Sequence, residues 1–286
     1  RHLFGSLLHK IFGLTLSQLG TSLSPPGQSS VRSICSSLLG VSSRKIIMGT
    51  EFTQEMRKST KEIHRISDLL VNAKLGTLIF SNEAWAEGLC LFYPIFRYLE
   101  MAMRRHKNEE LGRYLSIPEI LRSKEFEKDI QFFRGMNFLL DSCQETMPVR
   151  CYIKHLEHVE AENANLLLAY VYHMYMGLFS GGQILLRKYL LRNRLGLQSD
   201  PGGSCVTTFN GDITAKKRLM KEITNDICGK LTEGERRKIL EEGVTLFKLN
   251  NSLVKTVKTP SKVYITGITM SILVAAVVIY YLMLWA

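Results

Sequence analysis

Apolar residues recur with helical spacing over most of the chain between residues 51 and 254. The first such stretch, TQEMRKSTKEIHRISDLLVNAKLG, keeps its apolar residues near one helical face and ends at a glycine. Longer helices are predicted by EAWAEGLCLFYPIFRYLEMAMRRH, with a kink or shift at Pro94, and by the run from PVRCYIK to LLRKYLLRN. No long stretch alternates with the period of two that strands require. The pattern predicts one all-α domain over residues 51–254.

Local signals mark where some of these helices begin and end. In TEGERRKILEEG, Thr232 is an expected N-cap and Glu235 completes a capping box. The stretches KEFEKDIQFF and TAKKRLMKEITNDI predict two shorter helices. Residues 196–212, GLQSDPGGSCVTTFNGD, are rich in turn formers and predict a loop.

The two ends differ from this domain in composition. Residues 1–50 contain no Asp or Glu and are basic and rich in serine, which is typical of a mitochondrial transit peptide. The favoured interpretation is nevertheless a disordered or artefactual leader, because the chain begins with Arg and Met48 opens a different composition.

The C-terminal stretch is predicted to be a membrane anchor. Residues 263–286 carry no charge, and 24 residues of helix extend about 36 Å, enough for a hydrocarbon core of about 30 Å. Residues 255–262 form a short basic stem before it. The positive flank predicts that the main domain stays in the cytosol.

Charge and cysteine usage narrow the class of protein. The net charge of +11 favours acidic partners such as phosphates, carboxylates or a membrane surface. The six cysteines are irregularly spaced and include no CxxC pair. They indicate free thiols in a reducing compartment rather than a disulfide scaffold or a zinc site.

The stretch MGLFSGGQILL places three glycines within six positions of a helical run. Each mid-helix glycine costs about 1 kcal/mol relative to alanine, so the run carries a penalty of about 3 kcal/mol. Three explanations for these glycines are close helix packing, a phosphate loop, and a planar ligand lying against a bent helix. The phosphate loop lacks the spacing and lysine of a Walker motif.

A planar metallo-macrocycle would also need an axial ligand, and histidines are the candidates. His64 lies near an apolar stripe, and His173 lies on the glycine-containing helix itself. His155 and His158 are three residues apart, but without a nearby third ligand they indicate a solvated face. On periodicity alone, His64 is more typical of a surface or satisfied core residue.

Two motifs resemble those of a known family. STKEIHRISDLLVNAKLGTL resembles the first helix of the heme oxygenases, and YHMYMGLFSGGQIL resembles their distal helix. IPEILRSKEFEKDIQFF and RRKILEEGVTLFKLN also fit that family. The resemblance covers residues 53–253 in one order and extends to the C-terminal anchor of the eukaryotic, membrane-anchored type.

The resemblance implies a helical domain that holds heme between its first helix and a kinked distal helix. It assigns His64 as the proximal ligand of the heme iron. It also implies that Gly177, Ser180, Gly181 and Gly182 belong to a catalytic segment whose backbone lies over the heme, which would explain the glycines.

By the same resemblance, Tyr172 and Arg57 lie near the heme propionates. Lys217 and Lys221, four residues apart, match a basic pair of a later helix only after a two-residue shift. A solvated face is the alternative for these two lysines.

The family's chemistry is also implied by the resemblance. Heme b is both cofactor and substrate, and O2 and electrons open its ring to give biliverdin, carbon monoxide and ferrous iron. The electrons come from NADPH through NADPH–cytochrome P450 reductase, and biliverdin reductase is a further candidate partner. The expected location is the endoplasmic reticulum membrane, with mitochondrial targeting by residues 1–50 as the minor alternative. No nucleic acid is expected.

Three positions depart from the family's pattern, and Leu178 matters most. Leu178 stands where the family has an aspartate that orders water over the heme, Met174 replaces an arginine and Phe179 a leucine. Two functions follow from this departure. One is a heme oxygenase of reduced efficiency or regioselectivity, and the other is a heme-binding sensor or carrier without turnover.

Overall fold

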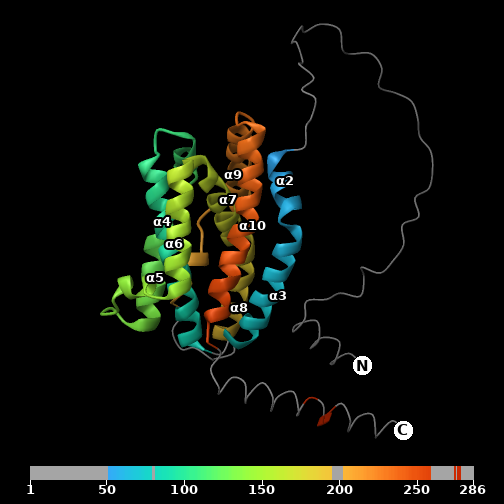
Figure 1. Cartoon of the computed structure of the whole chain (residues 1–286). Helices are drawn as coiled ribbons and strands as arrows, with labels where there is room; N and C mark the ends of the chain where they lie inside the picture. The colour runs from blue at the N-terminus through green and yellow to red at the C-terminus, as the bar shows by residue number, and fades with distance from the viewer. Residues whose placement is uncertain (1–50, 79–80, 195–201, 259–273, 275, 278–286) are drawn as a thin grey trace, which may run out of the picture. The chain divides into compact units, whose positions relative to one another are not determined.

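Helices form every regular element in the part of the chain that the structure describes (Figure 1). The computed structural model describes residues 51–78, 81–194 and 202–258, together with 274, 276 and 277. The α-helices are α2 (Phe52–Ser59), α3 (Lys61–Leu78), α4 (Asn82–Arg105), α5 (Ser123–Arg134), α6 (Met147–Glu162), α7 (Leu168–Gly177), α8 (Gln183–Arg194), α9 (Ile213–Cys228) and α10 (Glu233–Thr256). The shorter turns are η2 (Glu110–Ser116), η3 (Leu140–Gln144), η4 (Ala164–Leu167), η5 (Leu178–Gly182) and η6 (Cys205–Thr207). The all-α prediction is confirmed.

Capping explains several of the helix ends. The capping box of Thr232 and Glu235 is present at the start of α10, as predicted. The hydroxyl of Ser81 accepts the Ala84 N–H at 3.1 Å and starts α4. This helix continues through Pro94 for 24 residues, so the proline does not end it.

The prediction of one continuous first helix is wrong. The stretch is divided into α2 and α3 at Thr60. The Thr60 hydroxyl donates to the Met56 carbonyl at 2.7 Å, and the Thr60 N–H reaches the same oxygen at 3.2 Å. Local side-chain hydrogen bonds of this kind compete with helix propagation.

The long run after residue 147 is also divided. The backbone of Asn163 is extended and ends α6, while its side chain accepts the Asn165 N–H at 2.9 Å and starts η4. The predicted 196–212 loop is irregular in its described part, except for the short turn η6.

Helix α10 is packed against α2, α3, α6 and α7, so it connects the first two helices to the rest of the bundle (Figure 1). Its residues Ile239, Leu246 and Leu253 are fully buried, at most 1% exposed. They repeat every seven residues and form the stripe that an amphipathic helix turns toward a core. The bundle therefore has one continuous apolar core, to which α4, α6 and α7 contribute most of the remaining residues.

A polar cluster joins the ends of α4 and α6. The Glu160 carboxylate accepts hydrogen bonds from Tyr98, from Arg105 at 2.6 and 2.9 Å, and from His106 at 3.0 Å. Burial acts to raise the pKa of Glu160, but these hydrogen bonds outweigh it and lower the pKa to about 2.

Residues 1–50, most of 263–286 and Cys35 lie outside the described residues. Within the described residues, no helix has the length and apolar character needed to cross a bilayer. The leader and the anchor therefore stay predictions. The cysteines of the described ranges, Cys90, Cys143, Cys151, Cys205 and Cys228, have free thiols.

Candidate functional site

His64 is presented to solvent by the first turns of α3. Its side chain is 54% exposed, and its Nδ1 lies 3.0 Å from the carboxylate of Asp68, one turn further along the helix. The imidazole ring meets the ring of Phe247 from α10 edge-on, with centroids 5.1 Å apart. Because Nδ1 is paired with Asp68, Nε2 is the ring nitrogen left available to a metal.

His173 also contacts Phe247 edge-on, with ring centroids 5.3 Å apart. Its Nε2 is inaccessible to solvent and has no hydrogen-bond partner in the described structure. A Cβ at Gly243 would lie 3.2 Å from this nitrogen, so α10 closes over it. Burial, and secondarily the charge of His64, lower the pKa of His173 to about 3. Of the two candidate ligands, only His64 is therefore accessible to an external ligand.

The glycine stretch forms a π-helical turn, η5, between α7 and α8. Such turns are rare and often lie at functional sites. A Cβ at Gly177 or at Gly181 would meet no atom within 4 Å, whereas one at Gly182 would lie 3.6 Å from the Thr207 methyl group. Gly177 and Gly181 therefore face open space, and Gly182 packs against the protein.

Phe247 connects the helices that carry the two motifs. Phe247 of α10 touches His64 on α3 and His173 on α7, so it lies between the helices that carry the two motifs. Further along, Lys188 of α8 donates to the Asn72 side chain of α3 at 3.4 Å and links the same two sides. An exposed imidazole on one side and glycines that leave open space on the other fit a flat ligand with a central metal.

The residues around Leu178 make this part of the site apolar. Leu178 is half-buried and packs against the hydrophobic core. Met174, one turn earlier, is 7% exposed, and its sulfur accepts the Asn250 amide at 3.4 Å. The Asn250 carbonyl oxygen accepts the Tyr152 hydroxyl at 3.1 Å.

Asn250 and Tyr152 were not predicted from the sequence. Asn250 follows Phe247 by three residues, a spacing that places both on neighbouring turns of one helix face. That spacing is the signal that could have identified Asn250. For Tyr152, no local pattern distinguishes a buried hydroxyl from a core tyrosine.

Tyr172 and Arg57 lie close enough for the charge of Arg57 to act on the Tyr172 hydroxyl, and their role at a heme propionate stays a prediction. Tyr172 is 6% exposed, and burial raises its pKa, while a hydrogen bond with Thr53 and the charge of Arg57 act in the opposite direction. Arg57 is exposed on α2. Lys217 is half-buried and Lys221 exposed on α9, a helix that packs against both α2 and α7. These two lysines have no hydrogen bond or ion pair within the described residues, and their role stays a prediction.

His155 is not simply solvated. Its Nε2 lies 2.8 Å from the Tyr170 hydroxyl and 2.9 Å from the Glu242 carboxylate, because α6, α7 and α10 meet there. His158 is exposed, as predicted. No group of three potential metal-ligating side chains occurs among the described residues.

Comparison with known proteins identifies the family. The family model for heme oxygenases matches residues 50–256. The chain belongs to the heme oxygenase family. Membership makes it an oxidoreductase, as the sequence predicts.

Curated relatives of the family come from distant organisms. Heme oxygenase 2 of Synechocystis is 27% identical over 208 residues, which cover 72% of this chain and 82% of the relative. Heme oxygenase 1 of Homo sapiens is 28% identical over 217 residues, covering 72% and 71%. Because cyanobacterial and vertebrate proteins both match, the membrane-anchored type stays a prediction.

Solved structures of the family share the fold. Heme oxygenase 2 from Chlamydomonas reinhardtii, solved without heme, superimposes with a TM-score of 0.65 at 23% identity and covers 74% of this chain and 99% of that one. Heme oxygenase-2 from Synechocystis in complex with heme and NO gives a TM-score of 0.62 at 25% identity, covering 72% and 84%.

Proposed function

We propose that this protein binds heme b in the gap between α3 and η5 and opens its ring to biliverdin, carbon monoxide and ferrous iron. The observation that carries the proposal is the pairing of an exposed His64 with open space at Gly177 and Gly181, in a chain of this family. Bound heme would supply the iron centre that activates O2 and the ring that is cleaved.

On the proximal side, His64 would bind the iron through Nε2. The Asp68 carboxylate accepts a hydrogen bond from Nδ1–H, which fixes the tautomer and makes the ring a better donor to a metal. The edge contact with Phe247 limits rotation of the imidazole. Asp68 and Phe247 therefore hold the His64 imidazole in one orientation before heme binds.

On the distal side, Gly177, Gly181 and the exposed Ser180 would let the backbone of η5 approach the heme face closely. Leu178 cannot hold a water molecule by hydrogen bonds, and Met174 offers only a weak acceptor. Met174 is linked to the Asn250 amide and, through it, to the Tyr152 hydroxyl, and burial raises the pKa of Tyr152, which therefore keeps its proton. This drier distal side supports a slower or less regioselective reaction.

At the edge of the gap, Arg57 and Tyr172 would bind a heme propionate, with Lys217 and Lys221 as further cations. A cation beside a carboxylate fixes which way the ring enters the gap. These residues would therefore help to set the regiochemistry of ring opening.

A heme-binding sensor or carrier without turnover is the second candidate, and the apolar surroundings of Leu178 favour it. An absorbance time course separates the two functions. With heme, NADPH and NADPH–cytochrome P450 reductase, an enzyme converts the heme bands into a biliverdin band. Heme bands that persist while NADPH is oxidised would support the sensor or carrier.

The remaining parts of the proposal concern location. The basic stem 255–262 and the uncharged 263–286 support a C-terminal anchor in the endoplasmic reticulum membrane, with the helical domain in the cytosol. A membrane-bound reductase would then be held near the protein, and biliverdin reductase would receive the product.

A further inference from the structure

Residues 204–210, here called the supporting segment, contact the π-helical turn η5 and the residue that follows it. The Gln183 side chain donates to the Thr207 carbonyl at 2.8 Å. The ring of Phe209 packs against that of Phe179, which is fully buried in the turn, with centroids 5.0 Å apart. The turn is therefore supported on the side opposite its open glycines.

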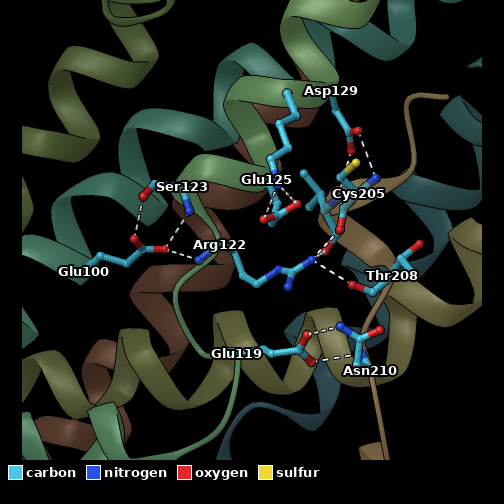
Figure 2. A network of polar contacts seen from close by, with 11 residues as sticks. Glu100, Glu119, Arg122, Ser123, Glu125, Asp129, Cys205, Thr208 and Asn210 are labelled. Carbon is cyan, nitrogen blue, oxygen red and sulfur yellow. Dashed lines mark hydrogen bonds and ion pairs between the residues drawn. The ribbon is translucent and has the colours of Figure 1, made fainter.

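Two buried charges hold the supporting segment from its other side (Figure 2). The carboxylate of Asp129 accepts the N–H groups of Cys205 and Val206, both at 2.8 Å. The guanidinium of Arg122 donates to the Cys205 carbonyl, to that of Val206 at 3.1 Å and to that of Thr208 at 2.9 Å. Asp129 thus satisfies the backbone N–H groups of Cys205 and Val206, and Arg122 satisfies their carbonyl groups.

Glu100 fixes this arrangement in turn (Figure 2). Its carboxylate accepts the Arg122 N–H, the Ser123 N–H at 2.7 Å and the Ser123 hydroxyl at 2.5 Å. Glu100, Arg122 and Asp129 are only 2–3% exposed. A buried charge that loses its partner destabilises a protein strongly, so the network favours a single geometry of the supporting segment.

The π-helical turn needs such support. Its hydrogen bonds are less favourable than those of an α-helix, and glycines give its backbone more freedom than other residues would. Gly177 and Gly181 have no neighbour on their open side that could restrain them. The ring of Phe209 lies 4.2 Å from the Arg122 guanidinium and so connects the buried network directly to the turn.

We propose that Asp129 and Arg122 are positioning residues of the distal side, which act through the supporting segment to set the height of Gly177 and Gly181 above the heme face. The role assigned to the glycines rests on the proposed function. The restraint itself belongs to the protein and can be measured without heme.

The test is hydrogen–deuterium exchange of the full-length, heme-free protein. In Asp129→Asn, an amide group meets the N–H of Cys205 or Val206 in place of an accepting oxygen. We expect the backbone amides of residues 177–183 to exchange at least tenfold faster than in wild type, while those of α6 keep their rates. Glu160→Gln is the matched control, because it makes the same carboxylate-to-amide change in the polar cluster at the ends of α4 and α6. It should leave residues 177–183 unchanged.

A second variant, Phe209→Ala, removes the link while both charges keep their backbone partners, and it decides the matter if Asp129→Asn does not fold. It should also accelerate the exchange of residues 177–183. Because both substitutions act on the same link, the acceleration in the double variant should be smaller than the product of the two single-variant accelerations. In the heme-loaded protein, the stretching frequency of bound carbon monoxide should shift in Asp129→Asn and Phe209→Ala, and not in Glu160→Gln.

Unchanged exchange at residues 177–183 in folded Phe209→Ala, or acceleration equal to that of α6, would overturn the proposal. Its failure is distinguishable from failure of the proposed function. A protein that shows the exchange effect but never forms biliverdin would retain the positioning role and lose the enzymatic one.

Discussion

Replacing Leu178 by aspartate tests the interpretation of the distal side. Leu178 is half-buried against the core, and full burial of a leucine side chain is worth about 1.5–3 kcal/mol. The substitution therefore loses on the order of 1 kcal/mol of apolar burial, and desolvation of the new carboxylate adds a comparable amount. Domains of this size are stable by about 5–15 kcal/mol, so the variant should fold, with a Tm lower by a few degrees.

The expected gain in catalysis is larger than this loss. A hydrogen-bond donor or acceptor placed at the reacting group changes rates by about 10²–10³, equivalent to about 2.7–4 kcal/mol. The carboxylate would stand one turn from Met174 and close to Gly182, and the open space beside Gly177 and Gly181 would admit water to the same turn. We expect Leu178→Asp to form biliverdin faster, with a larger share of the α isomer.

The assay is the yield of biliverdin per NADPH consumed, with isomers separated by chromatography and released hydrogen peroxide measured in parallel. Leu178→Ala is the control for added space without a polar group, and Leu178→Asn supplies hydrogen bonds without charge. The expected order of yield is aspartate, asparagine, then alanine. If alanine equals aspartate, or if the wild type already gives fast and purely α cleavage, the reasoning about Leu178 is refuted.

Three further predictions concern other parts of the protein. His64→Ala should lose the histidine-type heme spectrum and regain it with added imidazole, and an unchanged spectrum would assign the iron to another ligand. Deletion of residues 263–286 should release a soluble, heme-binding protein, whereas pelleting with membranes after a carbonate wash would place the anchor elsewhere. Glu160 has a lowered pKa in the folded state, so its contribution to stability is present above the unfolded pKa near 4.5 and is lost as pH falls toward 2. Glu160→Gln should therefore flatten the fall in unfolding free energy between pH 4.5 and 2, and an unaltered slope would contradict this.

Local sequence signals predicted the helical domain because its helices are amphipathic and some carry their own caps. The capping box at Thr232 and the glycine-rich distal stretch needed no long-range information. The break at Thr60 was missed because no proline or glycine marks it. It depends on a threonine hydroxyl that turns back to the Met56 carbonyl, which the sequence alone does not distinguish from a solvent-exposed hydroxyl.

Long-range contacts account for what the sequence could not show about the site. Arg122 and Asp129 would be placed on the surface by residue type, yet they are buried because they satisfy a backbone segment 76–86 residues further along the chain. The different accessibility of His64 and His173 also depends on long-range packing. Both are histidines near apolar residues, and only the packing of α10 at Gly243 buries one and leaves the other accessible.

The two residues that follow α10 are tied by hydrogen bonds to two other helices. The carbonyl of Val257 accepts the Lys74 ammonium at 2.5 Å, and the N–H of Lys258 donates to the Glu87 carboxylate at 3.0 Å. The described domain therefore ends at a point fastened to both α3 and α4. A load applied through the following residues is transmitted to α4 through Lys258 and to α3, the helix that carries His64, through Val257, so tension or tilt there reaches the proximal side of the site.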